Sequence, residues 1–156
     1  MRIMIAAPPK AGNSWVKCLL GHIYDLTGLR GHETPDIDDV AHFRDWAERG
    51  DFPDNSIFHQ HCPYSDELAD AVEAVPAHLV TIIRDPYDAM VSLYFFVQVQ
   101  AEAAQKGGRE RLQRRRDDPM AGLASDDPAT IPYLDEAMDA YLIRAKNWLD
   151  SGRSVV

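Results

Sequence analysis

The chain has 156 residues, of which 46% are hydrophobic and 26% charged, and this predicts one water-soluble globular domain with a buried core. The formal net charge of −9 argues against general attraction to nucleic acid or to anionic membranes. No apolar run is long enough for a membrane span or a secretory signal, and the two cysteines do not make a disulfide framework. We therefore expect a cytoplasmic protein without nucleic-acid or membrane partners.

Alternating strands and helices are expected in the first half of the chain. Residues 2–7 form an apolar run that is typical of a buried strand, and beyond it Trp15, Leu19 and Ile23 recur at helical spacing. The elements expected here are a strand at 2–7, a helix at 14–27 that ends at Gly28, a helix at 38–50 closed by Gly50, a strand at 56–61 and a helix at 65–75.

The second half continues this alternation. The segment "HLVTIIR", residues 78–84, is apolar and β-branched, which is typical of a strand in a parallel sheet. A long helix is expected from Asp85, which can cap it, with Pro86 in its first turn, and residues 106–131 indicate a mobile loop. The last expected features are a helix at about 132–150 with Leu134, Met138, Leu142 and Leu149 on its buried side, an end at Gly152 and the start of a strand at 154–156.

Strands that alternate with helices predict an α/β fold, in which helices cover both faces of a parallel sheet. Ligands bind such sheets at the carboxyl ends of the strands. Two of the expected strand ends carry side chains that suit an anion.

The first is the loop "PPKAGNSW", residues 8–15. The helix after Gly12 presents unpaired amides and the positive end of its dipole, Lys10 adds a full charge, and Asn13 and Ser14 add donors. The alternative is a capped turn with a solvated lysine. The Walker pattern of nucleotide-binding loops is not met, because no glycine directly precedes Lys10 and no hydroxyl residue directly follows it.

The second strand end is Arg84-Asp85-Pro86. Arg84 is expected to leave the strand where the next helix begins, which places a guanidinium beside the first amides of that helix, and Ser92 lies two helical turns further on. The alternative is an arginine paired with Asp85 or Asp88.

Three motifs resemble the cytosolic-type sulfotransferase family in their order and approximate spacing. "PPKAGNSW" is similar to the 5′-phosphosulfate-binding loop of that family. "RDPYDAMVSLYFF", residues 84–96, is similar to its 3′-phosphate-binding segment, and "HQHCPY", residues 59–64, resembles the segment that carries its general base.

The resemblance implies a sulfotransferase fold, a parallel-sheet relative of the P-loop-containing nucleotide hydrolases, and the donor 3′-phosphoadenosine 5′-phosphosulfate (PAPS), which leaves as 3′-phosphoadenosine 5′-phosphate (PAP). It implies that Lys10 and His61 are catalytic, His61 as the base that deprotonates a small-molecule hydroxyl or amine acceptor. The residues that it implies for donor binding are Lys10, Ala11, Gly12, Asn13, Ser14, Trp15, Arg84 and Ser92.

The chemistry of sulfuryl transfer fits these residue types. The transfer resembles phosphoryl transfer, in which positioning and charge stabilisation carry most of the catalysis. Lys10 would offset charge on the leaving oxygen, and a neutral imidazole accepts a proton near pH 7. No metal is expected, although His59 and His61 fall on the same face of a strand and would make a conceivable metal pair.

Some positions depart from the family pattern. Ala11 replaces a usual serine but keeps its backbone amide. His59 stands where the family often has lysine, which concerns the rate more than donor binding, and Cys62 stands where an apolar residue is usual.

Length is the largest departure, because full members of the family continue into a Tyr-Glu-Asp motif and a later Arg-Lys-Gly segment. Neither is found before Val156, so residues 1–156 are expected to be the N-terminal portion of a sulfotransferase domain, truncated at its C-terminus, or the product of a shortened gene. Apolar surface left uncovered would favour a homo-oligomer or poor solubility.

Other functions stay open at this point. A non-catalytic PAPS- or PAP-binding module, or an inactive remnant, fits the short chain, whereas a P-loop small-molecule kinase is disfavoured by the residues around Lys10. The basic run at 106–116 is either a solvated loop or a cover over the acceptor pocket, and its lack of aromatic residues disfavours nucleic-acid binding. The acceptor itself is not identified by any motif.

Overall fold

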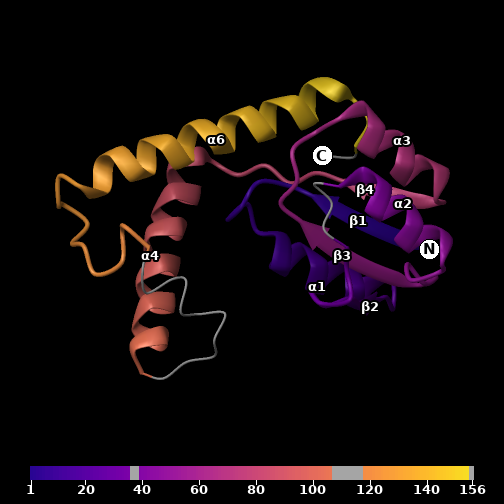
Figure 1. Ribbon diagram of the computed structural model, residues 1–156, viewed down its shortest axis with the longest axis horizontal. Coiled ribbons are helices and arrows are strands. Elements are labelled where there is room, and N and C mark those ends of the chain that lie inside the picture. Colours follow the sequence, from indigo (N-terminus) through magenta and orange to yellow (C-terminus); the bar gives the residue numbers. More distant parts are fainter. Residues whose placement is uncertain (36–38, 107–117, 155–156) are drawn as a thin grey trace. The chain divides into compact units, whose positions relative to one another are not determined.

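The computed structural model describes residues 1–35, 39–106 and 118–154. The chain divides into two compact units, one made of Met1–Ile83 with Ile143–Val156 and the other of Arg84–Leu142 (Figure 1). Most of the basic run at 106–116 and the end of the strand expected at 154–156 lie outside the described residues. Among the described helices, none combines the length and the apolar character that crossing a membrane requires.

A four-stranded parallel sheet forms the centre of the first unit. Its strands are β1 (Arg2–Ala6), β2 (Thr27–Gly28), β3 (Ser56–Gln60) and β4 (Ala77–Val80), and they lie in the order β2-β3-β1-β4 (Figure 1). In this register Met4 of β1 pairs with Phe58 of β3 and with Leu79 of β4. The predicted α/β fold with a parallel sheet is confirmed, and the carboxyl ends of these strands meet at one edge.

Helices cover both faces of this sheet. On one face, Phe43 and Trp46 of α2 (Val40–Glu48) and Leu68 of α3 (Asp66–Ala74) share a buried cluster with Met4 and Phe58. The next residue along β3, Ile57, points to the opposite face, because side chains alternate along a strand. There α1 (Asn13–Ile23) packs on the sheet, and a Cβ added at Gly21 would lie 3.8 Å from the Ile57 side chain.

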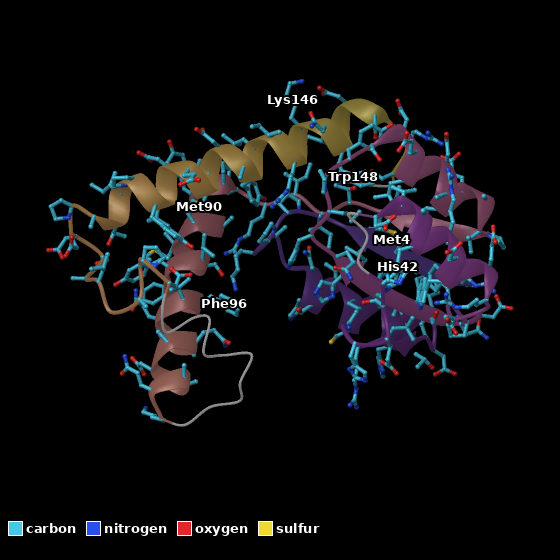
Figure 2. All side chains as sticks on the ribbon, in the orientation of Figure 1. Met4, His42, Met90, Phe96, Lys146 and Trp148 are labelled. Carbon is cyan, nitrogen blue, oxygen red and sulfur yellow. The ribbon has the colours of Figure 1, made fainter. Side chains whose placement is uncertain are left out.

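The last part of α6 (Thr130–Ser151) belongs to the first unit, and its Trp148 side chain packs into the core of that unit. This side chain is fully buried in the same cluster as Met4 (both labelled in Figure 2), and its Nε1 donates to the carbonyl oxygen of Cys62 at 3.1 Å. Just beyond the helix, Arg153 donates hydrogen bonds to Asp70 and Glu73 of α3. The end of α6 therefore completes the face of the sheet that α3 covers.

The second unit contains α4 (Pro86–Gln105) and the first half of α6. As predicted, Asp85 caps α4, and its side chain accepts a hydrogen bond from the amide of Asp88 at 3.1 Å. Gln98 on α4 holds the segment that leads to α6, since it donates to the carbonyl oxygen of Met120 at 2.7 Å and accepts from the amide of Gly122 at 2.8 Å.

Two predicted element ends are wrong. α1 ends at Ile23 rather than at Gly28, because Asp25 adopts a left-handed conformation (φ 52°) and Gly28 lies in the short strand β2. β4 ends at Val80, so Arg84 does not leave a strand directly as predicted but follows it after a short connection.

The predicted buried side of α6 is wrong in its second half. Leu142 and Leu149 are each 45% exposed, whereas Tyr141, Ala145 and Trp148 are buried. These three residues are spaced by four and three positions, so they lie on one helix face. The two leucines each follow a member of that face by one residue and are therefore rotated away from it.

Candidate anion and acid–base site

The loop between β1 and α1 is shaped at its carboxyl end by Gly12. This residue is the N-cap of α1 with φ 109°, a conformation that side chains with a Cβ rarely adopt, and its carbonyl oxygen accepts the first bonds of the helix, from the amides of Trp15 and Val16. The amides of Asn13 and Ser14 have no acceptor inside the helix, because they precede its first turn. The loop thus presents donors and a positive helix end beyond the carboxyl end of β1, as predicted.

The predicted loop residues differ in where their side chains lie. Ser14 is exposed and Trp15 is 71% exposed, whereas Lys10 is half-buried. Ala11 and Asn13 are buried, and the Asn13 side chain points back beneath the loop instead of outward. Its Nδ2 donates to the carbonyl oxygen of Pro8 at 3.2 Å.

Asn13 also contacts His61, the residue that directly follows β3. Its Nδ2 lies 3.1 Å from Nδ1 of His61, and the same ring nitrogen lies 3.1 Å from the carbonyl oxygen of Ala7. β1 and β3 are parallel neighbours, so their carboxyl ends lie side by side. This arrangement brings Asn13 into contact with His61, although the two residues are 48 positions apart in the sequence. The structure thus joins two of the predicted site residues directly.

The electrostatic surroundings of His61 favour its neutral form. The His61 residue stays exposed to solvent, but the partial burial of its ring lowers its pKa from the usual value. The hydrogen bond to the Ala7 carbonyl acts in the opposite direction, and the positive charges of Arg144 and Lys10 lower the pKa further. At neutral pH the neutral form of the ring therefore predominates. When its proton lies on Nδ1 and points to Ala7, Nε2 carries a lone pair that accepts a proton from a reacting group.

His59 lies beside His61, with the two ring centroids 5.7 Å apart. Burial, then the positive charge of Lys17, and then His61 lower the pKa of His59 to about 4. Its Nδ1 is buried and has no hydrogen-bond partner among the described residues. The ring is thus neutral at physiological pH and adds no permanent charge to the site. Within the described ranges, no group of three or more side chains is arranged to hold a metal ion.

Arg84 and Ser92, the other two predicted donor-binding residues, belong to the second unit. Arg84 forms an ion pair with Asp88 at 3.5 Å, which is one of the pairings that the sequence left open, and both side chains are largely exposed. Exposed pairs of this kind contribute little to stability, so Arg84 is able to exchange Asp88 for another anion. Ser92 is half-buried on α4.

Tyr141 supports Arg84 and was missed by the sequence analysis. Its hydroxyl accepts from the amide of Arg84 and donates to the carbonyl oxygen of the same residue, both at 2.9 Å. The side chain is buried, and burial raises the pKa of its hydroxyl. A tyrosine in a helix gives no sequence signal for such a contact, because its partner is 57 residues away.

The second unit also holds an apolar cavity of about 350 Å³ between α4 and the first half of α6. Met90 (labelled in Figure 2), Tyr94 and Phe95 line it from α4, and Met138 lines it from α6. The composition of this cavity suits an organic molecule rather than a phosphate group.

The chain is similar to known proteins along most of its length. The family model described as sulfotransferase domain matches residues 1–146. A protein named cytosolic sulfotransferase 17, from Arabidopsis thaliana, is 29% identical over 146 residues, which is 86% of this chain and 40% of that protein. The chain therefore spans less than half the length of this relative. No solved structure matches it significantly.

Proposed function

The chain belongs to the sulfotransferase domain family, and from this premise we propose that it transfers a sulfuryl group from PAPS to a hydroxyl or amine of a small-molecule acceptor, releasing PAP. The observation that carries the proposal is the contact between Asn13 of the anion-binding loop and His61, because it sets a proton acceptor beside a loop suited to an anionic donor. The name of the Arabidopsis relative supports a cytoplasmic location.

In this proposal the loop holds the 5′-phosphosulfate of the donor. The backbone amides from Gly12 to Ser14 surround the phosphate, while the Ala11 amide donates within the loop to the Pro8 carbonyl oxygen at 3.4 Å. Lys10 offsets the negative charge that develops on the leaving oxygen of the phosphate. The exposed indole of Trp15 offers a face on which adenine stacks. Since the Asn13 carboxamide points inward, Asn13 serves the donor through its backbone amide.

His61 is the general base in the proposed reaction. Its Nε2 takes the proton from the acceptor oxygen or nitrogen while that atom forms a bond to sulfur. The bond between sulfur and the bridging oxygen breaks at the same time, and its electron pair leaves on the 5′-phosphate of PAP. The Ala7 carbonyl accepts a hydrogen bond from the Nδ1–H of His61 throughout the reaction, which orients the ring and stabilises the imidazolium that forms.

Arg84 and Ser92 bind the 3′-phosphate of the donor in this proposal. Isothermal titration of the chain with PAP and with adenosine 5′-monophosphate, which lacks that phosphate, tests the assignment. PAP is expected to bind about 10- to 100-fold more tightly, as a charge-assisted hydrogen-bonded pair implies. Arg84→Met should remove most of that difference. Equal affinity of the unaltered chain for both nucleotides would refute the assignment.

Sulfuryl transfer from PAPS to a panel of phenols and amines tests the reaction itself. His61→Ala should lower the rate by about 10²–10⁴ and leave PAP affinity nearly unchanged. His59→Ala, the matched control two residues earlier on β3, should have a milder effect. Lys10→Ala should weaken both binding and transfer without unfolding the chain. Binding of PAP with no transfer to any acceptor would identify a binding module instead.

A further inference from the structure

The neighbours of Asn13 decide which way round its carboxamide lies. With Nδ2 toward Pro8, it donates to the Pro8 carbonyl oxygen at 3.2 Å; the reversed orientation would set two acceptor oxygens against each other. This orientation leaves Oδ1 of Asn13 buried and without a hydrogen-bond partner among the described residues, although the side chain is only 4% exposed. A buried, unsatisfied carbonyl oxygen is costly, so the present position of the carboxamide is not a strongly preferred one.

The same orientation places a donor against Nδ1 of His61. That nitrogen lies 3.1 Å from Nδ2 of Asn13 and 3.1 Å from the carbonyl oxygen of Ala7, a donor on one side and an acceptor on the other. A neutral imidazole satisfies only one of them at a time. With the proton on Nδ1, the ring donates to Ala7; with the proton on Nε2, Nδ1 accepts from Asn13.

The two tautomers differ in what they can do in the proposed reaction. The Nδ1–H form leaves a lone pair on Nε2 and accepts a proton there, whereas the Nε2–H form does not. Asn13 stabilises only the second form. Because it is also the first residue of α1, directly after Gly12, its side chain is attached where an anion would bind.

We propose that Asn13 is a positioning residue that couples the anion-binding loop to His61. Without a ligand, its carboxamide holds part of the population in the Nε2–H form. An anion on the loop accepts the backbone N–H of Asn13 and shifts this residue, so that its inward-pointing carboxamide moves away from Nδ1 of His61. Only Ala7 then faces Nδ1, and the ring shifts to the Nδ1–H form. This deepens the proposed function, since binding of the donor would then prepare the base.

Nitrogen-15 NMR of the imidazole ring tests the coupling without any need for turnover, because protonated and unprotonated ring nitrogens differ widely in shift. Asn13→Leu, which keeps a similar volume but has no donor, should raise the Nδ1–H to Nε2–H ratio of His61 at least about fivefold, the factor that one ordinary hydrogen bond represents. Ser14→Ala, a neighbouring change on an exposed side chain, should leave the ratio unaltered. Asn13→Ala serves if the leucine variant does not fold.

The pH titration of the same signals gives a second readout. A hydrogen-bond donor that faces Nδ1 disfavours protonation of that nitrogen, so removing the donor should raise the pKa of His61. The other charged or titratable groups that act on this ring are unchanged in the variant: Lys10, Arg144 and the neighbouring His59. A merely structural role for Asn13 would not shift the tautomer ratio and the pKa together in these directions.

PAP titrated into the unaltered chain completes the test, with binding measured separately by calorimetry. Bound PAP should shift His61 toward the Nδ1–H form, and the Asn13→Leu variant should show no further shift. An unchanged tautomer ratio in both Asn13 variants, or a shift toward Nε2–H when PAP binds, would overturn the coupling. Failure of PAP to bind would count against the proposed function alone, because the comparison of the ligand-free variants still decides the role of Asn13.

Discussion

The half-buried ring of His59 predicts a loss of stability when the pH falls below neutral. Its folded-state pKa is about 4, compared with 6.5 for the unfolded chain. Well above pH 6.5 the ring is neutral in both states, so its titration does not change the free energy of unfolding. As the pH falls from 6.5 toward about 4, the unfolded chain binds the proton first, so the free energy of unfolding decreases over this range.

The size of the effect follows from the difference between the two pKa values. A difference of about 2.5 corresponds to about 3.4 kcal/mol, at 1.36 kcal/mol for each pH unit. Because the ring is only half-buried, solvent reduces this to about 1.5–2 kcal/mol. That is a large share of the total stability of an ordinary domain, which is about 5–15 kcal/mol.

Urea unfolding at about pH 7 and at about pH 4.5, followed by tryptophan fluorescence, measures the loss. His59→Phe replaces the ring with one that does not titrate and removes its unsatisfied nitrogen. The carboxylates lose stability in both proteins, so the difference between the two losses isolates His59. The phenylalanine variant should lose about 1.5–2 kcal/mol less than the unaltered chain. Equal losses in the two proteins, or an NMR titration of His59 near 6.5, would refute the reasoning.

Three further substitutions test the packing of both units. Trp148→Ala should cost about 3–5 kcal/mol of unfolding free energy in urea, because it opens a cavity and removes the hydrogen bond from Trp148 Nε1 to the Cys62 carbonyl; a cost below about 1 kcal/mol would contradict that. Tyr141→Phe should cost about 0.5–1.5 kcal/mol and speed amide exchange at Arg84, since the backbone N–H and carbonyl of Arg84 lose their shared partner; unchanged exchange would rule out the bridge. Arg153→Ala removes ion pairs with α3, so it should lower the melting temperature slightly at low salt and less at high salt, where the charges are screened. An effect that does not depend on salt would argue against these ion pairs.

Several predictions from the sequence were correct because they depend on interactions within a few residues. The strand at β1 and the start of a helix after Gly12 are of this kind, as is the cap that Asp85 provides to α4. Such features are decided by side-chain pattern and backbone preference, and neither needs a distant partner. The loop suited to an anion and the family resemblance therefore followed from the sequence.

Only the tertiary structure decided which faces are buried and which groups meet. Leucines at helical spacing predicted the wrong side of α6, because the neighbours of a helix, and not its own period, select the face that packs. The contact of Asn13 with His61 likewise depends on the parallel register of β1 and β3, which places their carboxyl ends side by side. Local sequence does not encode that register, since it results from burial of the whole sheet between its helices.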